Sequence, residues 1–197
     1  HDLLKSFYFD LLRFAIDPRK TENIRNGKKT IWANIGPQQF HLPEGSPSAQ
    51  AFNGQVTLAY PSVKSIQDRY ENTNVKDILK ETQFSMTAYH PGNSAKTELH
   101  LTDPWGTKFR VVEDLGGHHV DLRGSQPGEE SEGFSITDIT VHVPRGSNFA
   151  GIERFYEMII GTPSAIICNE VSCVISVGPT QTLSFREQPT VGGDLDE

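Results

Sequence analysis

Polar side chains that recur at every second position of two strand-like segments are the residues of this sequence best placed to do chemistry. Gln39 and His41 lie two apart in one segment, and Asp138, Thr140 and His142 have the same spacing in the other. Side chains of a β-strand alternate between its faces, so each set shares one face. Imidazole, amide and carboxylate groups on a common face can bind a metal ion or line a polar cup. For the Asp138 set, a solvated strand face is the interpretation that the pattern favours.

Familiar catalytic motifs are absent from the sequence. It contains no Gly-x-Ser-x-Gly elbow, no phosphate-binding loop and no closely spaced Cys/His zinc signature. Neither Cys168 nor Cys173 has a basic neighbour in the sequence that would mark it as a nucleophile. The two cysteines flank a predicted tight turn, and we expect two buried or half-buried thiols rather than a cross-strand disulfide.

The charge of the chain is unevenly distributed. Residues 1–114 carry a net charge of +1 and the remainder carries −8, which together give the −7 of the whole chain. Phosphate would be repelled by the acidic second part, so we expect no nucleic-acid partner. No apolar run reaches the roughly 20 residues of a membrane span, and no signal peptide is recognisable. We therefore expect a soluble, intracellular protein, and an organelle such as a plastid is a compatible compartment.

Hydrophobic periodicity divides the chain into two parts. The first opens with a helix over 3–12, which Asp17-Pro18 is expected to end. The strands predicted in this part cover residues 30–35, 38–42, 56–60, 84–89, 96–101 and 108–112, with a helical stretch after Pro61. A polar, glycine-rich segment at 115–133 is interpreted as an interdomain linker between domains 1–114 and 134–197. The second part predicts a strand at 134–143, a helix at 149–160 and strands near 164–169, 173–177 and 181–186.

An internal repeat supports this division. Phe7-Tyr8 followed by Leu11-Leu12 matches Phe155-Tyr156 followed by Ile159-Ile160, an offset of 148 in the numbering. The order helix, strand, strand, strand recurs in both parts. A unit of this kind cannot bury both faces of its sheet alone, so we expect it to pair with a partner unit.

Several motifs in this order resemble the glyoxalase, bleomycin-resistance and extradiol dioxygenase (vicinal oxygen chelate) superfamily. They are the Phe-Tyr-x-x-Leu-Leu helix at residue 7, Gln39-Phe40-His41-Leu42, Gly54-Gln55-Val56 and Asp103-Pro104-Trp105-Gly106-x-x-Phe109. The resemblance implies an α+β fold of paired βαβββ modules whose curled sheets form a cup. It further implies that the first domain lacks its first strand and that the second domain contains only its first module. We expect the chain to be a portion of a longer protein, or to be completed by another chain.

The resemblance also implies where a metal would be bound, and these positions depart from the family pattern. The fourth-strand ligand, usually Glu, aligns with His41, and the fifth-strand ligand, usually His, aligns with Gln55. The eighth-strand ligand, usually Glu, aligns with Arg110, whose guanidinium has no lone pair to offer a cation. Arg110 in a cup would instead suit an anionic or carbonyl-bearing molecule, or it could pair with a nearby carboxylate. In the second domain Asp138 takes the place of a His ligand, and its counterpart is Leu183 or Ser184.

These departures predict a small-molecule binding protein, or an enzyme of non-standard mechanism, with Gln39, His41, Gln55 and Arg110 in the site. We expect no resident cofactor; the alternative is a divalent metal (Fe, Zn, Ni or Mn) held by His41, Gln55 and, in the second domain, Asp138. If the protein is an enzyme, the resemblance implies a metal-dependent lyase or ring-cleaving dioxygenase with ligands partly outside this chain. A non-catalytic architectural subunit, docked into a homodimer or larger assembly that completes the missing strands, remains a further alternative.

Overall fold

The computed structural model describes residues 2–18, 26, 30–43, 49, 51–92, 96–114, 130–161 and 166–188. Its contacts divide the chain into two compact units. Unit 1 comprises His1–Ala51 and Val56–Thr137, and unit 2 comprises Phe52–Gln55 and Asp138–Glu197. Residues 115–129 of the predicted linker lie outside the described residues, so the division at 114 and 134 stays a prediction. No helix in the described parts of the chain is long and apolar enough to cross a membrane.

The first helix forms where the periodicity predicts it, but it ends at Leu11, before Asp17-Pro18. A short turn α1 (Asp2–Leu4) continues into the π-helix η1 (Lys5–Leu11), in which the N–H of Leu12 donates to the carbonyl of Phe7 at 3.1 Å. The expectation that Asp17-Pro18 ends this helix is wrong. Arg13 adopts a left-handed backbone conformation, and the short strand β1 (Ala15–Ile16) begins before Asp17 is reached.

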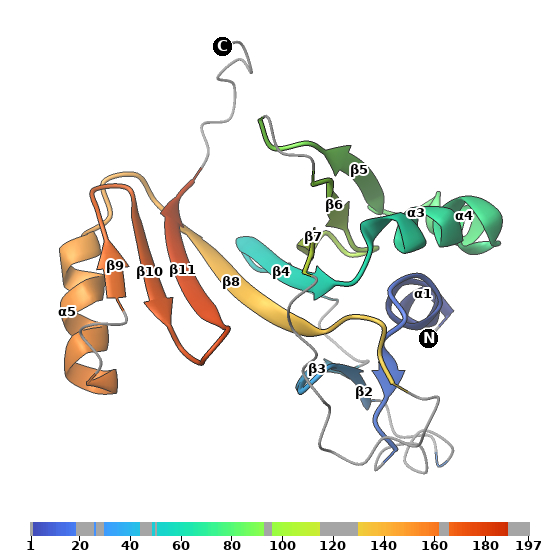
Figure 1. Cartoon of the computed structure of the whole chain (residues 1–197), viewed down its shortest axis with the longest axis horizontal. Helices are drawn as coiled ribbons and strands as arrows, with labels where there is room; N and C mark the ends of the chain where they lie inside the picture. The colour runs from blue at the N-terminus through green and yellow to red at the C-terminus, as the bar shows by residue number, and fades with distance from the viewer. Residues whose placement is uncertain are drawn as a thin grey trace. The chain divides into compact units, whose positions relative to one another are not determined.

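Unit 1 contains the strands that alternation predicts. Strands β1, β2 (Thr30–Ile35) and β3 (Gln38–Pro43) form an antiparallel three-stranded sheet in that order. Strands β5 (Ser85–Tyr89), β6 (Glu98–Thr102), β7 (Lys108–Glu113) and β4 (Gly54–Tyr60) follow one another in a second sheet, with β7 parallel to β4. Helices α3 (Val63–Asn72) and α4 (Val75–Leu79) connect β4 to β5, and Figure 1 shows them beside α1. A turn at Asp103 connects β6 to β7: the carboxylate of Asp103 accepts from the N–H groups of Trp105 and Thr107.

The core of unit 1 is formed by apolar side chains on one face of each sheet and by the helices. Phe7 and Tyr8 of η1 contact Phe109 of β7, with ring centroids 5.7 and 6.3 Å apart. Leu99 and Leu101 point into this core and His100 between them is exposed, as the alternation predicts. On β6 the opposite face therefore carries the polar side chains of Glu98 and His100.

Unit 2 repeats the order of elements seen from β4 to β7. Strand β8 (Ser135–Val143) starts in unit 1 and continues into unit 2, followed by α5 (Phe149–Ile160), β9 (Ile166–Cys168), β10 (Ser172–Ser176) and β11 (Thr182–Glu187). The strand order is β8-β11-β10-β9, with β8 parallel to β11, and α5 covers one face (Figure 1). Asn148 caps α5 by accepting from the N–H of Gly151, and Gly161 ends it at φ +70°. The mixed α+β class is confirmed.

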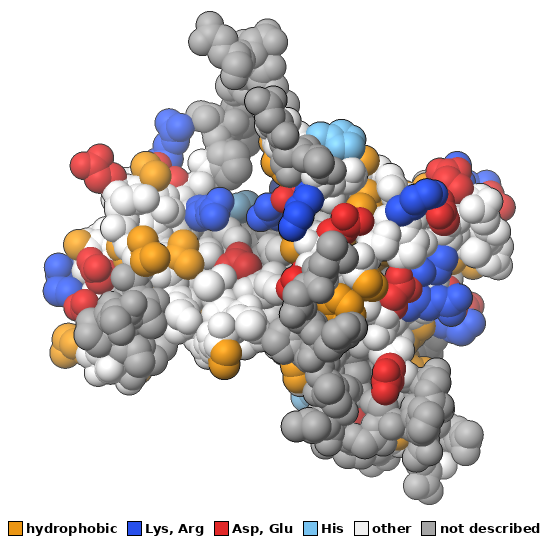
Figure 2. All heavy atoms as spheres, in the orientation of Figure 1, with side chains coloured by type: hydrophobic (Ala, Val, Ile, Leu, Met, Phe, Trp, Pro, Cys, Tyr) orange, Lys and Arg blue, Asp and Glu red, His pale blue; other side chains and the backbone are white. Residues whose placement is uncertain are grey.

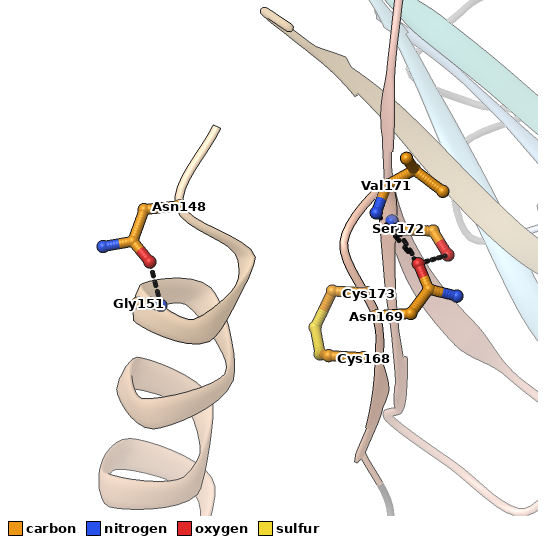
Figure 3. The surroundings of a disulfide bond; sticks show 7 residues. All are labelled: Asn148, Gly151, Cys168, Asn169, Val171, Ser172 and Cys173. Atoms are coloured by element: carbon orange, nitrogen blue, oxygen red, sulfur yellow. Dashed lines mark hydrogen bonds between the residues drawn. A yellow bond between two sulfur atoms is a disulfide. The ribbon is translucent and has the colours of Figure 1, made fainter. Parts of the chain in front are cut away.

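The two cysteines do not remain thiols in the structure. Cys168 of β9 and Cys173 of β10 are directly opposed across the strands and form a disulfide (Figure 3). The intervening turn is set by Asn169, whose side-chain oxygen accepts from the N–H groups of Val171 and Ser172. The preference for free thiols is therefore wrong, because this turn brings the two Cβ atoms face to face.

Candidate functional site

One face of the β1–β2–β3 sheet carries a connected set of polar side chains. Gln39 and His41 share this face, and the antiparallel register places Asn34 opposite Gln39 and Trp32 opposite His41. Asp17, directly after β1, joins them through its side chain. We call Asp17, Trp32, Asn34, Gln39 and His41 the β1–β3 polar cluster. The other face, with Ala33, Ile35 and Phe40, packs into the core of unit 1.

Hydrogen bonds fix the orientation of the Gln39 amide. Its Nε2 donates to Oδ2 of Asp17 at 2.7 Å and to Oδ1 of Asn34 at 2.6 Å. With its amino end directed at Asp17 and Asn34, the amide of Gln39 turns its oxygen, which can only accept, the other way. That oxygen, Oε1, lies 2.9 Å from Nε2 of His41.

The tautomer of His41 follows from this arrangement. Because the amide oxygen of Gln39 is an acceptor only, the proton of the neutral imidazole resides on Nε2, and Nδ1 keeps its lone pair. The ring stacks on the indole of Trp32, with centroids 4.4 Å apart and planes 3° from parallel. His41 is exposed, so Nδ1 is accessible as a hydrogen-bond acceptor, a base or a ligand.

The inner end of the cluster is unusual for a sheet surface. Asp17 and Asn34 are both fully buried, with 0% of their surface exposed. Nδ2 of Asn34 is buried, and no acceptor among the described residues reaches it. Buried polar atoms are ordinarily hydrogen-bonded, and an unpaired one costs about 1–3 kcal/mol. The unpaired Nδ2 of Asn34 is therefore a local cost to stability, and such costs are commonly found at functional sites.

Arg110 lies outside this cluster and is already paired. Its Nε and Nη2 donate to the two carboxylate oxygens of Glu98 at 2.7 and 2.6 Å, across the β6–β7 pair. The alternative in which Arg110 pairs with a nearby carboxylate is therefore the one seen. Oε2 of Glu98 also lies 3.9 Å from Nε2 of His100. The hydrogen bonds from Arg110 are the main reason that the pKa of Glu98 lies below its ordinary value.

Replacing Glu98 with glutamine is expected to remove part of the acid sensitivity of unit 1. Because the pKa of Glu98 is lower in the folded than in the unfolded chain, its stabilisation is complete above the ordinary value of 4.5. That stabilisation disappears as the pH falls through the lowered pKa. Urea unfolding between pH 7 and pH 3 should show a smaller loss of stability in Glu98→Gln than in wild type. Identical pH profiles would contradict the assignment.

Asp138 stands at the centre of a second polar group, in unit 2. Its Oδ1 accepts from the hydroxyls of Thr182 and Ser184 at 2.5 and 2.6 Å, and its Oδ2 accepts from Thr140 at 2.5 Å. Thr140 and Ser184 are buried, so these hydroxyls are satisfied within the sheet rather than by water. The expected solvated face is therefore wrong for Asp138 and Thr140, because β11 supplies partners from the parallel strand.

The donor set does not fit the metal centre that the resemblance implies. His41 offers one nitrogen, Arg110 is a cation engaged by Glu98, and both oxygens of Asp138 accept from hydroxyls. Gln55 is a half-buried residue of β4 in the segment that groups with unit 2. Within the described ranges no three His, Cys, Asp or Glu side chains gather in a group that could hold a metal ion.

Sequence reasoning found Gln39 and His41 but missed Asp17, Trp32 and Asn34. Period-two alternation in the predicted strand 30–35 would have placed Trp32 and Asn34 on one face. Asp17 gave no such signal, because Asp17-Pro18 was interpreted only as the end of a helix.

Comparison with solved structures places the fold. The chain is similar to glyoxalase I from Zea mays, with a TM-score of 0.56 at 12% identity over 96% of this chain and 64% of that one. It is also similar to a putative dioxygenase from Bacillus subtilis subsp. subtilis str. 168, with a TM-score of 0.55 at 10% identity over 97% of this chain and 61% of that one. The chain thus spans less than two thirds of either protein. No family model and no curated protein matches the sequence. The glyoxalase-type fold that the motifs indicate is confirmed.

Proposed function

From this glyoxalase-type fold, we propose that the chain binds a small hydroxyl-bearing molecule at the β1–β3 polar cluster without the four-ligand metal centre. Nδ1 of His41 accepts a hydrogen bond from the ligand and can act as a base toward it. The observation that carries the proposal is the chain of hydrogen bonds from buried Asp17 through Gln39 to His41. Holding one tautomer in a fixed orientation is the preorganisation that a binding or catalytic imidazole needs.

Two of the expected site residues, Arg110 and Gln55, are not part of the β1–β3 polar cluster. Arg110 is not assigned to the ligand, because Glu98 already takes up two of its donors. Gln55 stays a candidate on the strength of the resemblance alone.

Nitrogen-detected NMR of the His41 ring tests the arrangement first. The neutral ring should be the Nε2–H tautomer in wild type, and Gln39→Leu, which removes the acceptor, should give a mixture of tautomers. A wild-type ring that is protonated on Nδ1 would contradict the proposed role of His41.

Ligand and metal titrations then separate the proposal from its main alternative. A metal-ligating histidine is also commonly oriented through its second nitrogen, so the same hydrogen bond suits a metal-dependent protein. Hydroxycarboxylates such as lactate should shift the Trp32 indole and His41 signals, and His41→Ala should weaken their binding about tenfold or more. Stoichiometric binding of Zn²⁺, Ni²⁺, Fe²⁺ or Mn²⁺ that is lost in His41→Ala would overturn the metal-free proposal.

A further inference from the structure

A pocket of about 480 Å³ opens in unit 1 between the first helix and the turn that leads into α4. No member of the β1–β3 polar cluster lines it, so it is a different site. Figure 2 shows side chains of both charge signs together over α1, α3 and α4. The residues that line the pocket include Asp2, Lys5, Asp10, Arg13, Val75 and Ile78.

Arg13 occupies a backbone position that normally belongs to glycine. It follows the C-cap residue Leu12 and has φ +53°, and among the described residues no other non-glycine has positive φ. This conformation costs an ordinary L-residue about 1–2 kcal/mol, and helices commonly place glycine here to avoid that cost. Its carbonyl accepts from the N–H of Glu132 at 3.0 Å, which holds the backbone in place.

The side chain of Arg13 gives a reason for the unfavourable backbone. Arg13 is exposed and is one of the residues that line the pocket, to which it brings a cationic side chain. Outliers of this kind persist where the surrounding structure enforces them, and they are concentrated at binding and catalytic sites. A glycine at position 13 would fold at least as well, so the choice of arginine points to a use for its charge.

The remaining lining residues indicate what the pocket would bind. Lys5 adds a second cation, and Asp2 and Asp10 supply two carboxylates. Lys5 and Asp10 lie 3.6 Å apart with 70% and 38% of their side chains exposed, a weak pairing that a ligand can replace. Val75, which is buried, and Ile78 add an apolar surface to the lining. A ligand that carries both charges and an apolar group matches this set.

We propose that this pocket binds a zwitterionic amino acid or short peptide. Its carboxylate pairs with the Arg13 guanidinium, which can grip both oxygens, and its ammonium lies against Asp2 and Asp10. Its apolar side chain contacts Val75 and Ile78. The proposal is independent of the proposed function at His41.

Binding of L-phenylalanine and L-alanyl-L-phenylalanine to the full chain tests the site. Backbone amide signals of Thr73 to Ile78 should shift saturably in two-dimensional NMR with at least one of the two probes. 3-Phenylpropionate lacks the ammonium and L-phenylalaninamide lacks the carboxylate, so each analogue should bind about tenfold more weakly or worse. Absence of saturable shifts with both probes, or equal binding of the analogues, would overturn the proposal.

Substitution of Arg13 provides the decisive variant, because its effects on folding and on binding should have opposite signs. Arg13→Gly should melt at the same temperature as wild type or higher, yet bind the probe about tenfold more weakly or worse. His41→Ala is the matched control and should bind the probe like wild type. Retained affinity in Arg13→Gly, or equal loss in His41→Ala, would refute the site.

Discussion

Replacing Gly36 with alanine is expected to lower the free energy of unfolding of unit 1 by about 3 kcal/mol or more. Gly36 forms the turn between β2 and β3 at φ +50°, where an L-side chain is disfavoured. A Cβ atom there would lie 1.8 Å from the backbone carbonyl oxygen of Phe134, which cannot rotate away as a side chain could. Relief requires the segment around Phe134 to move, with loss of the bond from the N–H of Gly36 to the hydroxyl of Ser131.

Gly92 provides a matched control for this experiment. Its φ is +49°, nearly the same as that of Gly36, but among the described residues nothing lies within 4 Å of an added Cβ. Gly92→Ala should therefore lower the free energy of unfolding only by the cost of the left-handed backbone conformation, about 1–2 kcal/mol. Urea unfolding followed by tryptophan fluorescence measures both variants. Equal costs would mean that the contact between Gly36 and Phe134 is not rigid.

Most strands and helices of this fold could be predicted because the burial of one face produces a periodic pattern of apolar residues in the sequence. In β6 the apolar Leu99 and Leu101 alternate with the exposed His100, and that pattern alone identifies a strand with one buried face. Asn148 and Gly161 mark the ends of α5 for an equally local reason, since caps satisfy backbone groups within a few residues. Local physics therefore located most strands and helices.

The site could be predicted only where its partners are close in the sequence. Gln39 and His41 are two residues apart, so their common face was evident, whereas Asp17 is 22 residues from the amide that it orients. Arg110 was placed in a ligand position by the resemblance, but its partner Glu98 comes from the neighbouring strand through the β6–β7 register. The sequence of β6 or of β7 alone does not specify how the two strands pair. The role of Arg110 could therefore not be predicted from the sequence.

At the end of the predicted linker, Glu132 also has partners that are far away in the sequence. Its replacement is expected to cause the second large loss of stability. The carboxylate of Glu132 pairs with Arg69 of α3, with Oε2 2.6 Å from Nη1, and its other oxygen accepts from the hydroxyl of Ser65. Nε of Arg69 donates to the carbonyl of Leu11 at 2.8 Å, so this ion pair ties three segments of unit 1 together. Nη2 of Arg69 is already buried without a partner among the described residues.

Glu132→Ala is expected to destabilise unit 1 by about 3–5 kcal/mol, because it leaves the guanidinium of Arg69 nearly buried and without its counter-charge. Only 15% of the Arg69 side chain and 22% of the Glu132 side chain are exposed. The matched control on the same helix is Asp68→Ala, which removes the exposed partner of Lys64 and should cost no more than about 0.5 kcal/mol. Adding Arg69→Met to Glu132→Ala should recover part of the loss, since no buried charge then remains. If urea unfolding gives Glu132→Ala and Asp68→Ala the same cost, the residues at the end of the predicted linker do not hold unit 1 together.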